Sequence, residues 1–160
     1  MSTPFDNNFR LVNLEGADGF TFKHFPSGIE SSARANWQAQ DVTVGTKPLY
    51  YGSREPRQIR LDDLWLDNTD TGDSVTPDIE TLFRLMEEVE GKGRPPALLA
   101  MWGDRQERCV LTDLTVFEQF FLFEGTPIRA RVSLTLLQFQ EDTQPPVRRV
   151  RENEESSFTF

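Results

Sequence analysis

The sequence predicts a mainly β domain, built as an antiparallel β-sandwich or barrel with one flanking α-helix at about residues 76–90. The first observation behind this prediction is strict apolar-polar alternation in several segments, which is typical of strands with one buried face. The second is that Gly, Pro and Asn/Asp clusters separate these segments, as turns do in antiparallel sheets. The third is that only one stretch has apolar residues at helical spacing.

The clearest element is a hairpin within residues 108–139. Two β-rich runs flank Gly125-Thr126-Pro127, where Gly125 tolerates positive φ and Pro127 has no N–H to give to a strand ladder. In the second run Ile128, Ala130, Val132, Leu134 and Leu136 alternate with polar residues. The first run carries aromatic residues at both parities, namely Phe117, Phe120, Phe121 and Phe123. One buried face does not explain these aromatic residues, whereas burial of the second face in an assembly does.

Further strands are expected on both sides of the helix. Alternation and turn signals predict them at 11–14, 20–22, 58–67, 97–102 and 107–116. Residues 29–40 fit either a helical turn or an irregular edge strand, and we favour the strand. Residues 45–57, with two Gly and two Pro, are expected to form a long ordered loop.

The strand at 58–67 breaks its own alternation. Ile59 and Leu61 have one parity, and Leu64 and Leu66 have the other. The strand is therefore either buried on both faces or bulged near Asp62-Asp63.

The helix is expected to begin with Thr76 as its cap and Pro77 in its first turn, and to close at Gly91. One stripe on it is apolar and is predicted to be core. The stripe consists of Ile79, Leu82, Phe83, Met86 and Val89.

The chain of 160 residues divides into a β domain at 11–140, an N-terminal arm at 1–10 and a C-terminal tail at 141–160. The arm is polar apart from isolated Phe residues, so we expect it either to be flexible or to order only against a partner. The tail is expected to be either disordered or a docking peptide ending in Phe158-Thr159-Phe160. The longest apolar runs are far below the roughly 20 residues of a membrane helix, so we expect no direct membrane insertion.

The composition argues against nucleic-acid binding, catalysis and metal binding. A net charge of −9 disfavours sequence-independent nucleic-acid binding, which depends on Lys and Arg. The single cysteine, Cys109, and the single histidine, His24, show no spacing that favours catalysis, and Cys109 is expected to be a small core residue. Residues 67–74 lack the helix–loop–helix frame of a calcium loop. We therefore expect no enzyme activity, no cofactor and no metal site.

Charge is distributed unevenly along the chain. Residues 62–90 hold ten acidic residues and one basic residue, Arg84, while Arg129 and Arg131 lie on the polar side of the hairpin. In a monomer these arginines are simply solvated. In an assembly they could meet the acidic segment of a neighbour in a head-to-tail ring.

Four motifs together carry a family resemblance over about residues 10–140. They are Phe25-Pro26-Ser27, Tyr51-Gly52-Ser53-Arg54-Glu55-Pro56-Arg57, the segment from Arg94-Pro95-Pro96 to Trp102-Gly103, and Phe121 to Val132. In this order they resemble the tube-like domain of contractile injection system proteins. They are most similar to baseplate proteins that carry this domain before a LysM module. No LysM-like segment follows residue 140.

The resemblance implies a fold of phage tail-tube and type VI secretion tube type, in which homohexameric rings join their sheets around a channel. It implies an adaptor ring between the inner tube and the spike of the baseplate, with a tube initiator or a repeating tube subunit as alternatives. Tube and spike proteins would be the partners, in a particle assembled in the cytoplasm. Interface candidates are Tyr50, Tyr51, Arg54, Arg57, Phe121, Phe123, Arg129, Arg131, Phe158 and Phe160.

A second hypothesis comes from another class, a small β-barrel that binds a ligand inside. It requires a large apolar internal cavity, whereas the ring hypothesis expects a filled core. A third, a hydrolase that uses Cys109 and His24, predicts an activity lost in Cys109→Ala; we expect no such activity.

Overall fold

The computed structural model describes residues 8–17 and 19–140. Seven of its strands form one antiparallel sheet in the order β2-β1-β7-β8-β9-β6-β3, and β4 pairs with β5 in a separate ribbon. The strands are β1 (Arg10–Asn13), β2 (Gly19–Thr21), β3 (Ile29–Ser32), β4 (Ala35–Ala39), β5 (Leu49–Arg54), β6 (Gln58–Asp67), β7 (Leu98–Trp102), β8 (Arg105–Phe121) and β9 (Pro127–Gln138). The helix is α1 (Thr76–Arg84). The prediction of a mainly β fold with one helix is confirmed for the described residues.

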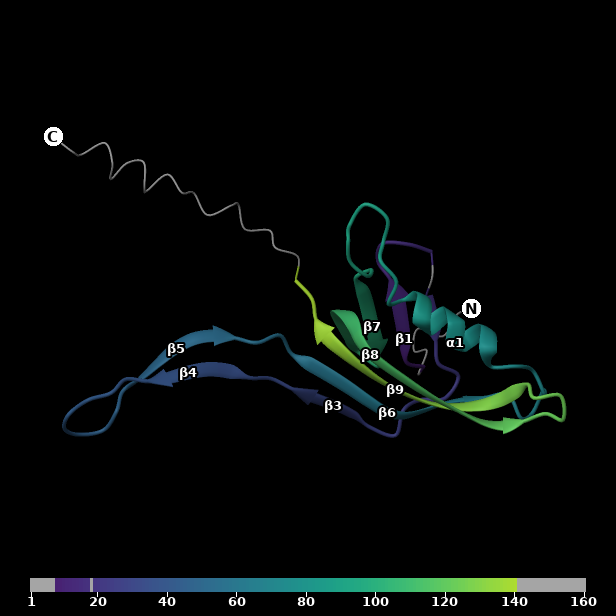
Figure 1. Cartoon of the computed structure of the whole chain (residues 1–160), viewed down its shortest axis with the longest axis horizontal. Coiled ribbons are helices and arrows are strands. Elements are labelled where there is room, and N and C mark those ends of the chain that lie inside the picture. Colours follow the sequence, from purple (N-terminus) through teal and green to yellow (C-terminus); the bar gives the residue numbers. More distant parts are fainter. Residues whose placement is uncertain (1–7, 18, 141–160) are drawn as a thin grey trace.

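The predicted hairpin is the centre of the sheet, where β8 pairs with β9 and β9 with β6. In its turn Gly125 has φ +89°, and the Leu122 amide donates to the Thr126 carbonyl at 2.8 Å. Ala130, Val132, Leu134 and Leu136 are buried. Figure 1 shows the sheet bending, so that β7 and β1 stand across the direction of β6 and β9, and α1 contacts β2 at the margin of the sheet.

A bulge resolves the broken alternation of β6. The register with β9 shifts between Leu61 and Leu64, and Asp63 takes φ +57°. The shift reverses side-chain parity, because two residues of one strand then oppose one of its partner. Ile59, Leu61, Leu64 and Leu66 are consequently all buried in one core, which confirms the bulge and not two buried faces.

The helix is shorter than predicted and begins differently. Val75 is the N-cap residue and no side chain caps the helix, so the predicted capping role of Thr76 is wrong. The helix ends at Arg84 and not near residue 90, because the next turns use bonds of the i to i−3 type, such as Glu87 amide to Arg84 carbonyl at 3.1 Å. The chain then turns back, with Val89 bridging to Arg94.

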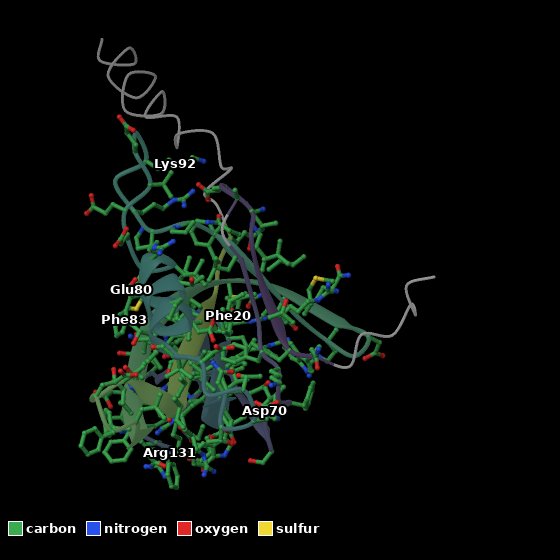
Figure 2. The ribbon with its side chains drawn as sticks, turned by 90° about the vertical axis from the view of Figure 1, so that its right-hand side faces the viewer. Phe20, Asp70, Glu80, Phe83, Lys92 and Arg131 are labelled. Carbon is green, nitrogen blue, oxygen red and sulfur yellow. The ribbon has the colours of Figure 1, made fainter. Side chains whose placement is uncertain are left out.

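The predicted helical stripe is only partly core, since Met86 and Val89 are half-buried and lie beyond the end of the helix. Ile79 and Leu82 are buried, whereas the Phe83 side chain is 46% exposed. In Figure 2, Phe83 and Glu80 are labelled side by side on the same flank of the molecule. The helix therefore buries a narrower set of side chains than predicted, and Phe83 lies at the edge of its buried face.

The expectation for the N-terminal arm is wrong at its last residues. Phe9 is fully buried, with its ring centroid 5.8 Å from that of Phe22 and 5.7 Å from that of Trp102. The Phe22 amide also donates to the Phe9 carbonyl at 2.9 Å. Order at this position therefore comes from the domain itself, while residues 1–7 lie outside the described chain.

The segment 45–57 is not the predicted loop. Residues 49–54 form β5, which pairs with β4 from Ala35↔Arg54 to Ala39↔Leu49. Pro48 and Pro56 stand just outside the strand, so the turn-forming residues bound it without interrupting it. We call the ribbon of β4, β5 and their connection the arm (residues 35–54). It extends away from the rest of the fold in Figure 1.

Candidate assembly surfaces

The arm has an apolar face and a polar face, and neither contains a buried residue. Directly paired residues share a face of an antiparallel ribbon, so Trp37 lies with Tyr51, and Ala39 lies with Leu49. The Trp37 and Tyr51 ring centroids are 5.3 Å apart. We call these four residues the apolar arm face.

The opposite face of the arm is held by polar contacts. Gln38 pairs with Tyr50, and the Tyr50 hydroxyl donates to the Gln40 side chain. The Asn36 amide donates to the Ser53 hydroxyl at 3.1 Å. The interface candidates Tyr50 and Tyr51 are therefore both exposed but point to opposite faces.

The second surface is the end of the β8–β9 hairpin, which we call the aromatic tip. Phe117, Phe120 and Phe121 are 55–58% exposed and Phe123 is fully exposed. Phe120 has φ +53°, an uncommon conformation for a bulky residue. Figure 1 places the arm and this hairpin end at opposite ends of the longest axis of the molecule.

Arg129 and Arg131 are engaged within the chain, contrary to their interpretation as simply solvated. Nε of Arg129 lies 3.8 Å from Asp67, and Nε of Arg131 lies 3.6 Å from Asp63. The guanidinium of Arg129 lies 4.2 Å from the centre of the Trp65 ring. In Figure 2, Arg131 is at the end of the molecule opposite Lys92.

The acidic partners of these arginines come from β6, within the acidic segment that the sequence offers to a neighbour. The pKa of Asp67 is held below its ordinary value by the hydrogen bonds from Thr69, with a further contribution from the positive charge of Arg129. The arginine side of the hairpin is thus already neutralised in part by its own chain.

The remaining predicted interface residues differ in exposure. Arg54 is exposed at the base of the arm. Arg57 donates to Glu107 at 2.9 Å and is partly buried, so its main contact is within the chain. Phe158 and Phe160 lie outside the described residues.

The third surface consists of the two unpaired edges of the seven-stranded sheet, β2 and β3. An edge strand presents a row of N–H and C=O groups that can pair with another chain. Three of the four β3 residues are exposed, and Ile29 is half-buried. The sheet is therefore open at both margins within the described chain.

Cys109 has the environment of a packing residue. It is fully buried, and burial raises the pKa of its thiol to about 12, with a small contribution from Glu107. A thiol of this kind is a poor nucleophile at neutral pH. The expectation that Cys109 is a core residue is confirmed.

The metal-site hypothesis requires a cluster of ligating side chains, and the ligand-barrel hypothesis requires an internal cavity. No group of metal-binding residues forms within residues 8–17 and 19–140, and Asp70 of the acidic loop instead pairs with Lys23 at 3.3 Å. The interior of the fold holds a contiguous apolar core from Phe9 to Leu136. A hollow of about 510 Å³ at the base of the arm is lined by Arg54, Glu55, Pro56, Gln138, Phe139 and Gln140.

Comparison with known protein families decides the class. The family described as contractile injection system tube protein matches residues 10–145. The chain belongs to this family. The predicted resemblance is thereby confirmed at the level of the tube-type family, and the family is a structural one. No curated protein matches the chain. Among the described residues no helix is long and apolar enough to cross a membrane.

Sequence reasoning missed the apolar arm face. Trp37 and Ala39 alternate with Asn36 and Gln38, and Leu49 and Tyr51 alternate with Tyr50, so the period of two was present on both strands. The flanking Gly and Pro residues hid it on the second strand.

Proposed function

We propose that this chain forms a homohexameric adaptor ring that joins the inner tube of a contractile injection system to the spike of its baseplate. Membership of the tube family is the observation that carries the proposal. The particle would assemble in the cytoplasm with tube and spike proteins of the same system. Three uncovered surfaces of the fold support the proposal.

The first support is the pair of open edges. When β3 of one copy pairs with β2 of the next, the seven-stranded sheets of successive copies join. Such a contact is head-to-tail, since the two edges differ, and head-to-tail contacts close into a ring when the rotation permits. Pairing between these two edge strands would be enough to make one continuous sheet around the ring.

The arm is the second support. A two-stranded ribbon is marginal in water on its own, and no residue of β5 is buried. Tyr50 and Arg54, on β5, would contact the adjoining copy or ring.

The aromatic tip is the third support. Phe121 and Phe123 expose their rings at the end of the molecule opposite the arm. Contiguous exposed apolar patches are rare on monomeric proteins and mark interaction sites. A surface at each end suits a component that contacts different proteins above and below.

The choice of adaptor rests on the motifs at 52–57 and 94–103, which most resemble the baseplate branch. A tube initiator or a repeating tube subunit remains the alternative. An adaptor gives single rings, whereas a repeating subunit stacks into filaments.

Negative-stain microscopy and mass measurement test the proposal on purified protein, alone and with its tube and spike partners. Single rings that bind both partners are expected. Filaments of this chain alone would favour the repeating subunit, and a monomer that joins neither partner would overturn the proposal.

A paired variant tests the aromatic tip. Phe121→Ser with Phe123→Ser should retain the melting temperature and lose binding to a partner or ring. Leu14→Ser, a change at an exposed apolar residue elsewhere, is the matched control and should change neither the melting temperature nor partner binding.

A further inference from the structure

The apolar arm face lacks a cover within the described chain. Trp37, Tyr51 and Leu49 are each more than half exposed, although they lie together on one face of a regular ribbon. A face of this kind gains free energy when apolar surface is removed from water. Its own sheet cannot cover it, since the arm extends away from the body (Figure 1).

The segment 141–160 begins where the arm begins. The Gln138 amide donates to the Arg57 carbonyl at 2.8 Å, and Gln138, Phe139 and Gln140 line one hollow with Arg54, Glu55 and Pro56. Chains of 18 residues span about 25 Å as a random coil and more when extended. Residues near position 158 are therefore tethered within reach of the arm at an effective concentration in the millimolar range.

The end of this segment matches the apolar arm face in pattern. Phe158 and Phe160 are two residues apart, so in an extended chain both rings lie on one side, about 7 Å apart. Trp37 and Ala39, and likewise Leu49 and Tyr51, have the same spacing on the arm. Aromatic pairs contribute about 0.5–1.5 kcal/mol beyond their area burial.

Acidic residues of the segment and basic residues of the arm have similar spacings from their aromatic residues. Glu152, Glu154 and Glu155 precede Phe158 by three to six residues. Arg34 precedes Trp37 by three residues, and Arg54 follows Tyr51 by three, so both arginines lie on the base side of the two rings. Both are exposed and neither forms an ion pair within the described part of the chain. A segment that runs outward along the arm would place its carboxylates near these arginines when its rings reach Trp37 and Tyr51.

We propose that residues 141–160 of the same chain dock on the apolar arm face, with Phe158 and Phe160 against Trp37 and Tyr51. The segment covers this face in the free subunit, and a neighbour that binds the arm there must displace it. The inference concerns contacts within one chain, so it stands or falls separately from the proposed ring.

Fluorine NMR of the full chain labelled with 5-fluorotryptophan tests the docking. Trp37, Trp65 and Trp102 give separate resonances, and Trp37→Phe assigns the first. Phe158→Ala with Phe160→Ala should shift the Trp37 resonance toward its solvent-exposed position and leave the other two in place. Thr159→Ala is the matched control and should shift none. An unchanged Trp37 resonance in the double variant overturns the proposal, as does movement of all three resonances.

A mixing experiment distinguishes docking within a chain from docking between copies. The labelled double variant is refolded together with unlabelled wild-type chain. The Trp37 resonance should remain at the position of the double variant, because the wild-type segment stays on its own arm. Recovery of the wild-type position would assign the contact to another copy and overturn the proposal.

Discussion

Asp63 shows how one residue sets the buried face of a whole strand. Its positive φ makes the bulge that returns Leu64 and Leu66 to the core side of β6. Asp and Asn tolerate this conformation better than other residues with a Cβ, and β-branched residues tolerate it worst. The Asp63 carboxylate also pairs with Arg131, so the same residue supplies both the backbone conformation of the bulge and an ion pair.

Asp63→Val should therefore lower the free energy of unfolding by about 1–2 kcal/mol, through strain at positive φ. Asp63→Asn keeps the tolerated conformation and should have a much smaller effect. Urea denaturation of both variants measures the difference. Asp62→Val, at the adjacent position without positive φ, is the control; an equal loss there would remove the backbone explanation.

Glu15 is a carboxyl group whose pKa is strongly lowered in the folded domain. Its carboxylate forms an ion pair with Lys92 at 2.9 Å and accepts hydrogen bonds from Arg94 at 2.8 Å and the Ala97 amide at 3.0 Å, and its side chain is only 10% exposed. These contacts, with Lys92 first, lower its pKa from 4.5 to about 2. They attach the turn at 89–94 to the connection after β1.

Because the pKa of Glu15 is lower in the folded state, its contribution is complete above pH 4.5 and is lost as the pH falls toward 2. Glu15→Gln should therefore melt below the wild type at neutral pH, and the gap should narrow across this window. Thermal unfolding at a series of pH values measures it. A gap that is constant with pH would contradict the assigned role of the charge.

At the scale of elements, the helix and the arm depart most from what local pattern suggests. The helix stops at Arg84 because its later residues make tighter turns toward the Val89–Arg94 bridge. The arm is a ribbon because β4 supplies a partner for Leu49–Arg54. In both cases a contact outside the segment decides its conformation.

Two adjacent apolar residues of α1, Leu82 and Phe83, differ in burial. Leu82→Ala should cost about 2–5 kcal/mol, because Leu82 is fully buried in the core. Phe83→Ala should cost much less, since nearly half of that side chain is already in water. Denaturant unfolding of the two variants makes the comparison, and equal losses would place Phe83 in the core after all.

At the scale of the whole molecule, exposed aromatic surfaces occupy the two ends and a packed core lies between them (Figure 1). This distribution separates folding from assembly. Changes on the core side of the sheet should affect stability, whereas changes on the arm or the aromatic tip should affect association. Arg129 and Arg131 are the exception, because their partners Asp67 and Asp63 are in the same chain.

We predict that Arg131→Glu with Arg129→Glu weakens ring assembly more than folding, and that it also lowers stability by up to about 1 kcal/mol for each lost ion pair. Arg131→Glu combined with Asp63→Arg restores the pair within the chain and should be more stable than Asp63→Arg alone, because both variants carry the same backbone strain at position 63. Sedimentation and thermal unfolding of these variants separate the effects. If the swapped variant regains both stability and assembly, the arginines act only within the chain.

The fold class, the β8–β9 hairpin, the N-terminal hairpin and the resemblance to the tube family could all be predicted from sequence patterns. The fold elements depend on alternation and turn residues, which are local properties of the chain, whereas the family rests on the resemblance carried by the four motifs in their order. Tertiary structure decided the bulge over the two-faced strand, the burial of Phe9, the early end of the helix and the pairing that makes the arm. Each of these depends on a partner distant in sequence, and local pattern carries no information about which partner a segment meets.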